Sequence, residues 1–284
     1  MNRRQMLASS LAGLSGAAAL FWFLKHNPST FKIRGIAWQP DNATIDIDGN
    51  WDKLGITELL VQWSVVDDIA FIPNTGLSLA PHLPDWQRIA RQPWAQSVIM
   101  GLAGRFQEPE ARQQLEELTE LSLKIQATPL PLNIRGWYFP VEADPTWNDA
   151  PKMATALSRL KQPVWISAYD NTNIGAKDFT NWLTSWLPSN VGVLFQDGVG
   201  VHAREASVAR QYADALYKKL GANRLRIIIE AFRPMGPAGF RPASVAELLP
   251  QIEALQGYEL YLYDGPHYLN RNIVNEISSR LLNQ

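Results

Sequence analysis

Eight short apolar segments recur along the chain after residue 30, and longer amphipathic segments separate most of them. Segments that are apolar on both faces and alternate with helices predict a parallel sheet covered by helices. About eight such units in roughly 250 residues is the usual size of a (β/α)8 barrel. No G-x-G-x-x-G follows the first segment, so the dinucleotide-binding open sheet lacks its fingerprint. The sequence therefore predicts an α/β fold, a single-domain (β/α)8 TIM barrel over residues 30–284, with strands at 31–39, 58–67, 97–104, 133–142, 163–171, 191–201, 224–232 and 258–266.

Residues 1–29 do not belong to this pattern. Arg3 and Arg4 precede an uncharged stretch at residues 6–24, which as a helix would span about 28 Å, near the thickness of a bilayer core. This is typical of a twin-arginine-like signal peptide, with an uncleaved membrane anchor and a buried helix as the alternatives. Because positive charge stays inside, we expect the barrel to be periplasmic, exported or anchored to the outer face of the inner membrane. Membrane contact is then expected only through residues 1–25.

Composition excludes several functional classes. The net charge is −1, the pI is near 6.4, and no dense Lys/Arg run follows the first residues, which argues against nucleic-acid binding. The absence of cysteine excludes disulfides, thiolate metal sites and Cys nucleophiles. The four histidines are widely spaced without H-E-x-x-H, and G-x-S-x-G is absent. Zinc hydrolases and serine esterases are therefore disfavoured, and no metal or cofactor is expected.

Polar and aromatic residues follow the predicted strands, where a parallel barrel carries its chemistry. Carboxylates and amides can hold sugar hydroxyls, and flat rings can stack on sugar faces. The expected substrate-binding residues are Trp38, Gln62, Trp63, Trp137, Tyr138, Tyr169, Asp170, Gln196, Asp197, Arg233, Tyr263 and His267.

Two glutamates end the fourth and seventh predicted strands: Glu142 in GWYFPVEAD and Glu230 in LRIIIEAF. Glycoside hydrolysis usually takes two carboxyl groups that face each other across the scissile bond. The arrangement resembles the large clan of retaining glycosidases with catalytic glutamates on strands 4 and 7. More narrowly, GWYFPVEAD and FQDGVGV resemble motifs of a bacterial family of glycoside-hydrolase-like (β/α)8 barrels.

This resemblance implies that Glu142 is the acid/base and Glu230 the nucleophile. One position departs from the clan, which usually has Asn before the strand-four glutamate, where this chain has Val141. A contact to the sugar would then have to come from another residue.

Structural alternatives accompany these assignments. Glu230 could form an ion pair with Arg233 or Arg226, and Glu142 could cap the following turn. Asp197 precedes a glycine, which is a turn signal, and its other interpretations are substrate binding or the second carboxylate of an inverting pair with Glu142. The tryptophans near strand ends could belong to the core instead of a sugar platform.

The function expected from these features is an exported glycoside hydrolase that acts on an envelope or secreted polysaccharide. Its expected partners are a polysaccharide or oligosaccharide substrate and exopolysaccharide synthesis or export proteins. Two alternatives use the same barrel: a non-catalytic glycan-binding accessory of a polysaccharide secretion system, and a transglycosylase.

Overall fold

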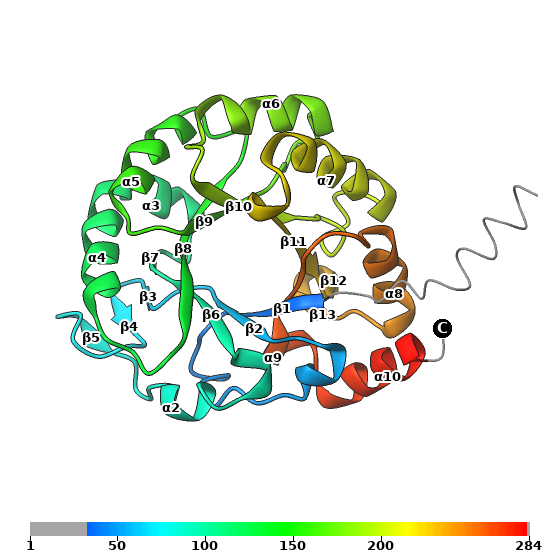
Figure 1. The fold of residues 1–284 in the computed structure, drawn as a ribbon, viewed down its shortest axis with the longest axis horizontal. Coiled ribbons are helices and arrows are strands. Elements are labelled where there is room, and N and C mark those ends of the chain that lie inside the picture. The colour runs from blue at the N-terminus through cyan, green and yellow to red at the C-terminus, as the bar shows by residue number, and fades with distance from the viewer. Residues whose placement is uncertain (1–32, 283–284) are drawn as a thin grey trace, which may run out of the picture.

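Eight parallel strands close into a barrel at the centre of the computed structural model, which describes residues 33–282 (Figure 1). Their spatial order is β1-β14-β11-β10-β9-β8-β6-β2. The predicted TIM-barrel fold is confirmed, because each of the eight predicted segments supplies one strand. In chain order these are β1 (Ile33–Trp38), β2 (Glu58–Val61), β6 (Ser97–Gly101), β8 (Ile134–Ala143), β9 (Val164–Ala168), β10 (Val191–Gln196), β11 (Leu225–Glu230) and β14 (Leu260–Tyr263).

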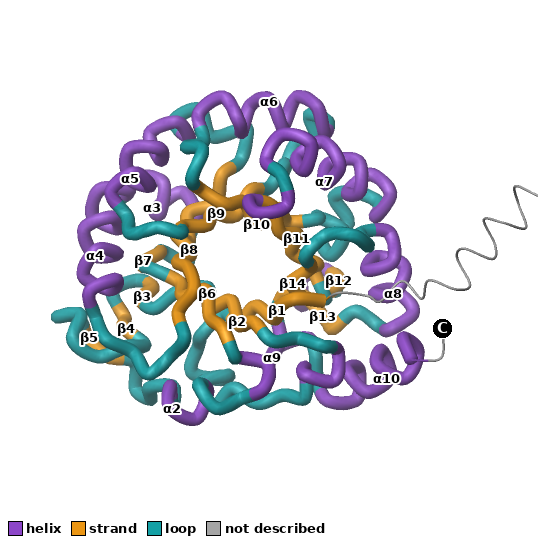
Figure 2. Tube along the Cα trace, in the orientation of Figure 1, coloured by secondary structure: helices purple, strands orange, loops and turns teal. Residues whose placement is uncertain are grey.

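Helices surround the ring of strands, as the tube view shows (Figure 2). The helix α7 (Ala206–Leu220) is followed by Gly221, whose N–H donates to the carbonyl of Tyr217 at 2.9 Å and whose φ is +75°, a conformation that favours glycine at a helix C-terminus. The helices are α2 (Trp86–Ile89), α3 (Glu108–Gln113), α4 (Leu115–Ala127), α5 (Met153–Arg159), α6 (Ala176–Trp186), α7 (Ala206–Leu220), α8 (Val245–Ala254), α9 (Gly265–Tyr268) and α10 (Arg271–Leu282).

The first two βα units depart from the regular alternation. Only a short 3-10 turn, η1 (Trp51–Leu54), lies between β1 and β2. After β2 the chain forms part of a small sheet before reaching α2, since three prolines and one glycine in residues 72–84 oppose a helix. The second predicted strand is therefore shorter than expected. The small sheet contains β3 (Val65–Val66), β4 (Ile69–Ala70), β5 (Ser78–Leu79) and β7 (Ala103–Gly104).

Four further short helical turns and one hairpin complete the elements of the described residues. The hairpin follows β11 and pairs β12 (Phe232–Pro234) with β13 (Phe240–Pro242). The turns are η2 (Pro93–Ala95), η3 (Ala150–Lys152), η4 (Ala222–Arg224) and η5 (Gly236–Ala238).

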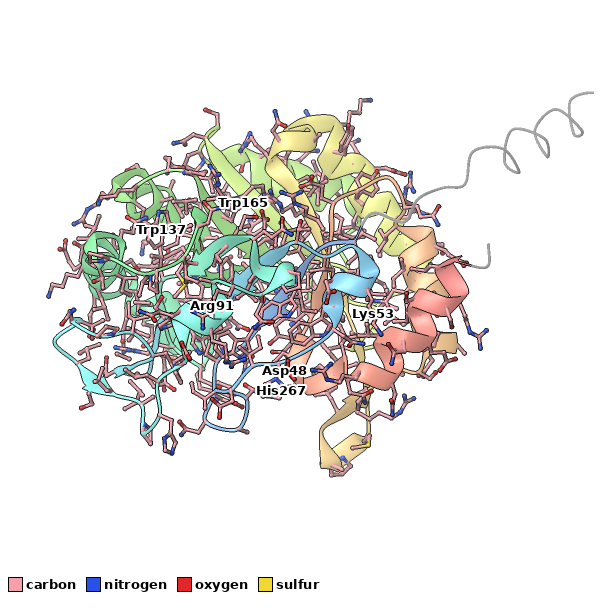
Figure 3. All side chains as sticks on the ribbon, turned by 60° about the horizontal axis from the view of Figure 1, so that its bottom comes forward. Asp48, Lys53, Arg91, Trp137, Trp165 and His267 are labelled. Atoms are coloured by element: carbon pink, nitrogen blue, oxygen red, sulfur yellow. The ribbon has the colours of Figure 1, made fainter. Side chains whose placement is uncertain are left out.

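Side chains that point inward fill the barrel. Successive residues of a strand face opposite sides, so on β8 Tyr138 lies in the barrel interior while Trp137 packs against the outer core (Figure 3). The barrel is therefore a packed core rather than a pore. The inner cluster consists of Ala37, Leu60, Ile99, Tyr138, Trp165, Leu194, Ile228 and Tyr261.

The predicted signal or anchor, residues 1–29, lies outside the described residues. Within residues 33–282, no helix has the length and apolar character needed to cross a membrane.

Candidate active site

A cavity of about 250 Å³ opens where the barrel strands end. Its floor consists of side chains from the barrel interior, among them Leu60, Leu194 and Ile228. An apolar floor with a few converging polar groups is typical of a small-molecule site. The polar and aromatic residues that line it are Gln39, Gln62, Trp63, Arg105, Phe106, Glu108, Tyr138, Glu142, Ser167, Gln196 and Tyr263.

Glu142 lies one residue before the end of β8. The alternation of side chains along the strand carries Tyr138, Pro140 and Glu142 to the cavity. Glu142 is half-buried, and the side-chain amide of Gln196 donates a hydrogen bond to its carboxylate. The turn after β8 is capped by Asp144 instead, whose Oδ1 accepts the N–H of Thr146 at 2.8 Å. The structure thus places the predicted acid on the cavity wall.

The surroundings of Glu142 favour its protonated form. Burial raises the pKa of Glu142 to about 7, and the charge of Glu108 acts in the same direction. The hydrogen bond from Gln196 and the charge of Arg112 oppose this shift but do not cancel it. A carboxyl group that keeps its proton near neutral pH can act as a general acid.

Glu108 is a cavity residue that the sequence analysis missed. It is the first residue of α3, and its Oε2 accepts the backbone N–H of Glu142 at 3.0 Å. Burial raises the pKa of Glu108, while Arg112, 3.9 Å away, stabilises its charged form. An acid followed by proline is typical of an ordinary helix start, so the sequence alone offered no reason to assign Glu108 to the cavity. Its position a few residues beyond the third strand is the signal that could have revealed it.

Hydroxyl and amide groups occupy the rest of the cavity wall. The Tyr263 hydroxyl oxygen lies 2.5 Å from Oε1 of Gln39 and 3.1 Å from Oε1 of Gln62. The Tyr138 hydroxyl group donates to Oγ of Ser167 at 2.9 Å. Such groups can exchange their mutual hydrogen bonds for bonds to sugar hydroxyls.

Glu230 ends β11 and is 3% exposed, and it does not line the cavity. The N–H of Val201 donates to its Oε2 at 3.1 Å. A Cβ built on Gly200 would lie 2.4 Å from Cβ of Glu230, so Gly200 and Val201, at the end of the segment 198–201, lie directly on this side chain. The expectation that Glu230 stands on an open groove wall is therefore wrong for this conformation. Its role as nucleophile stays a prediction.

The Glu230 carboxylate does not form the alternative ion pair with Arg226 or Arg233. Arg226 instead pairs with Glu58, with an N–O distance of 3.7 Å. Arg233 donates to the carbonyl oxygen of Glu230 at 3.2 Å, not to its carboxylate. Burial raises the pKa of Glu230, and the charge of Asp197 raises it further. A buried carboxyl group in this situation is held protonated.

Asp197 and Arg233, both predicted to bind substrate, are buried behind the cavity wall. Asp197 Oδ1 accepts the N–H of Val199 at 3.1 Å, which is the expected turn, and its Oδ2 accepts from Gln251 at 2.5 Å. Arg233 also donates to Oε1 of Gln251 at 2.8 Å. In this conformation these residues hold residues 197–199 and α8 in place rather than contact a ligand.

Two predicted tryptophan platforms belong to the core. Trp38 is fully buried, with its indole N–H donating to Oγ1 of Thr44 at 3.1 Å, and Trp137 packs outside the barrel. Trp63 lines the cavity, but it is 4% exposed and its ring lies 6.3 Å from that of Phe106. Phe106, 59% exposed, is therefore the more accessible ring at this edge.

Tyr169, Asp170 and His267 also lie outside the cavity lining. Arg204 stacks on the Tyr169 ring at 5.3 Å, and the buried Asp170 accepts from the Tyr212 hydroxyl at 2.7 Å. His267 lies at the periphery (Figure 3), where its hydrogen bond to Asp264 raises its pKa to about 9. The hydrogen bonds of Asp170 and His267 stabilise loops, and Arg204 packs on the ring face of Tyr169.

Metal ligands do not gather anywhere in residues 33–282: no three His, Asp or Glu side chains form a group that could hold an ion. The cavity offers acid–base chemistry through the Glu142 carboxyl group, whose pKa is raised to about 7, among amides and phenols.

Comparison with known proteins identifies relatives over most of the barrel. The family model described as a domain of unknown function, DUF4434, matches residues 50–270. The Escherichia coli (strain K12) protein YbcH, described as uncharacterized, is 25% identical over 232 residues, which are 69% of this chain and 75% of that protein.

Two solved structures share the fold. One is a candidate α-L-fucosidase from Bacteroides thetaiotaomicron, with a TM-score of 0.59 and 15% identity over 89% of this chain and 92% of that one. The other is the PgaB (BpsB) glycoside hydrolase domain from Bordetella bronchiseptica, with a TM-score of 0.51 and 12% identity over 86% and 98%. At these identities the likeness shows a shared barrel fold.

Proposed function

The chain belongs to the DUF4434 family, and we propose that it is a glycoside hydrolase in which Glu142 is the proton donor. The observation that carries the proposal is the half-buried Glu142 carboxyl group, which faces the cavity with a pKa raised to about 7 by burial and by Glu108. Cleavage of an acetal needs such a group beside the leaving oxygen. The fold shared with glycoside hydrolases supports the reaction class by analogy.

The second carboxyl group in this proposal is Glu230. A glycosidase needs its two carboxyl groups on opposite sides of the sugar, and Glu108 is bonded to the same wall as Glu142. Glu230 belongs to β11, which is separated from β8 in the barrel by β9 and β10. Ile228, two residues before Glu230 on the same strand, lines the cavity. A buried carboxyl group beside another carboxyl group is destabilising, which favours a functional reason for its presence.

The reaction then needs residues 198–201 to move away from Glu230. Exposure to water lowers the pKa of Glu230 and ionises it. Glu142 gives its proton to the glycosidic oxygen while the bond to the anomeric carbon breaks, and the Glu230 carboxylate bonds to that carbon. Water, deprotonated by Glu142, then releases the sugar from Glu230.

We also propose that the substrate is an envelope or secreted polysaccharide. This part rests on the twin-arginine-like pattern in residues 1–29, which lies outside the described residues. Involvement in exopolysaccharide synthesis or export remains a prediction of the same origin.

The test is hydrolysis of envelope polysaccharides by the purified protein, measured as new reducing ends. Glu142→Gln should lower the rate by about 10²–10⁴-fold, since a positioned acid contributes that much. Glu276→Gln, which changes an exposed carboxylate of α10, is the matched control. Cleavage that survives Glu142→Gln unchanged would overturn the assignment of the acid.

A non-catalytic glycan-binding role is the second candidate, and the burial of Glu230 is the observation that favours it. Polysaccharide binding without new reducing ends, equal in wild type and Glu142→Gln, would establish this role in place of hydrolysis.

A further inference from the structure

A second hollow, of about 730 Å³, lies beside the cavity on the outer side of α3. Its walls come from α3, the start of α4, the loop and turn η3 after β8, and α5, and these helices lie on the same side of the barrel (Figure 1). Pro109 and Arg112 of α3 face Trp147, Asp149, Lys152 and Thr155 across it. We call this hollow the α3–α5 groove.

One side chain connects the groove with the cavity. The Arg112 guanidinium donates to the carbonyl oxygen of Glu142 at 3.1 Å and lies 3.9 Å from the carboxylate of Glu108. The same guanidinium lies 5.2 Å from the centre of the Trp147 ring. The groove therefore begins one side chain away from the proposed proton donor.

Buried hydrogen bonds fix the loop that carries Trp147. Asp144 is 2% exposed, and its carboxylate accepts the N–H groups of Thr146 at 2.8 Å and Asn171 at 2.9 Å. Its carbonyl oxygen accepts the N–H of Trp147 at 2.9 Å. Because Glu142 and Trp147 follow each other along one anchored segment, the groove and the acid keep a fixed relation.

The sizes of the two hollows indicate how a substrate would be divided between them. The cavity, about 250 Å³, is at the lower limit for ligand sites, so it can enclose little more than a single sugar ring. The groove is larger and offers a tryptophan ring with polar side chains around it. Tryptophan is apolar on its face and a hydrogen-bond donor at its edge, which suits a sugar.

The charges in the groove balance. Two cations, Arg112 and Lys152, and two anions, Glu116 and Asp149, line it. Lys152 pairs with Asp149 at 2.9 Å. A groove without excess charge offers no net attraction to an anionic polymer, and it suits an uncharged one.

We propose that the α3–α5 groove binds the continuing units of an uncharged polysaccharide whose reacting unit occupies the cavity. The proposal rests on the proposed function for the position of the reacting unit. In this proposal the protein binds internal units of the polysaccharide chain, and Trp147 contacts a sugar unit beyond the cleavage point.

The experiment uses isothermal titration of the full chain carrying Glu142→Gln, so that ligands are not consumed. The probes are hexasaccharides and disaccharides of cello-, laminari-, manno- and chito-oligosaccharides, with hexagalacturonate as the charged comparator. At least one neutral hexasaccharide should bind about tenfold tighter than its disaccharide. Adding Trp147→Ala should weaken that hexasaccharide roughly three- to tenfold, the value of one aromatic contact, and leave the disaccharide unchanged.

Two further variants control for folding and for aromatic residues in general. Thr155→Trp places a bulky side chain at an exposed position of the groove wall and should cause the same selective loss. Tyr217→Ala removes an aromatic ring that is 44% exposed on α7 and should change neither affinity. Equal affinity for long and short ligands, a length preference that survives both groove variants, tighter binding of hexagalacturonate, or no binding would each overturn the groove proposal.

The same measurements distinguish this proposal from the proposed function. Length-dependent binding lost with Trp147→Ala, without any cleavage by the wild-type protein, would retain the groove and reject the hydrolase. Cleavage by the wild-type protein with equal affinity for long and short ligands would retain the hydrolase and reject the groove.

Discussion

Each of two walls of the barrel mouth carries a glutamate, Glu142 on one and Glu230 on the other. The two carboxyl groups differ in their exposure to the cavity. Glu142 is half-buried and faces the cavity, while Glu230 is 3% exposed beneath residues 198–201. Burial is the largest cause of a raised pKa in both, and a neighbouring carboxylate adds to it. A raised pKa alone therefore does not identify a catalytic acid. The position relative to the cavity separates the two, and motion of one short segment would remove the difference.

The largest expected effect tests whether the covered wall takes part in the reaction. Glu230→Gln should lower polysaccharide hydrolysis by roughly 10³-fold or more, because the amide cannot bond to the anomeric carbon. The measurement is the initial rate of reducing-end release, with Glu276→Gln, an exposed carboxylate of α10, as control. A rate close to that of the wild type would make Glu230 a structural residue and leave Glu142 without the partner proposed here.

The same substitution sharpens the comparison through stability. Glu230 binds its proton more tightly in the folded than in the unfolded protein, where its pKa is near 4.5. The contribution of Glu230 to the free energy of unfolding is therefore fully present below pH 4.5, and it is lost as the pH rises through the folded-state pKa of this group. The wild-type free energy of unfolding should fall over this range by at most about 1.4 kcal/mol per pH unit from this group.

Glu230→Gln should remove that part of the pH dependence and be the more stable protein above neutral pH. Urea unfolding followed by circular dichroism at several pH values measures this. Parallel pH profiles for the two proteins would show that Glu230 is not held protonated by its cover.

A smaller effect concerns the open wall, where two neighbours shift the pKa of Glu142 in opposite directions. The charge of Glu108 raises it and the hydrogen bond from Gln196 lowers it. In Glu108→Gln the alkaline limb of kcat/KM should move to lower pH, and in Gln196→Leu to higher pH, each by roughly one unit. Limbs that stay in place, or move in the same direction, would contradict the account of these two contacts.

Much of the fold could be predicted because one signal recurs eight times along the chain. Strand ends located by that pattern also identified part of the cavity wall, including Gln62, Gln196 and Tyr263. Trp137 was expected at the rim, but it alternates with the inward Tyr138, so strand parity already excluded it.

The remaining errors arise from loops. Glu108 belongs to a helix start whose sequence has an ordinary explanation, and only the path of the chain brings it to Glu142. The cover over Glu230 depends on where residues 198–201 turn, and the Asp-Gly signal predicts a turn without its direction. The groove beside α3 is formed by residues from three helices and a loop, and no local sequence pattern predicts that these segments come together.

The most direct test of the role of Glu142 varies the leaving group. On a dinitrophenyl glycoside of the sugar that the wild-type protein releases, the departing group needs no proton. Glu142→Gln should then form the glycosyl-enzyme at close to the wild-type rate, seen as a burst of dinitrophenol, while its cleavage of the polysaccharide is about 10²–10⁴-fold slower. An equal loss of rate with both leaving groups would contradict Glu142 as the proton donor.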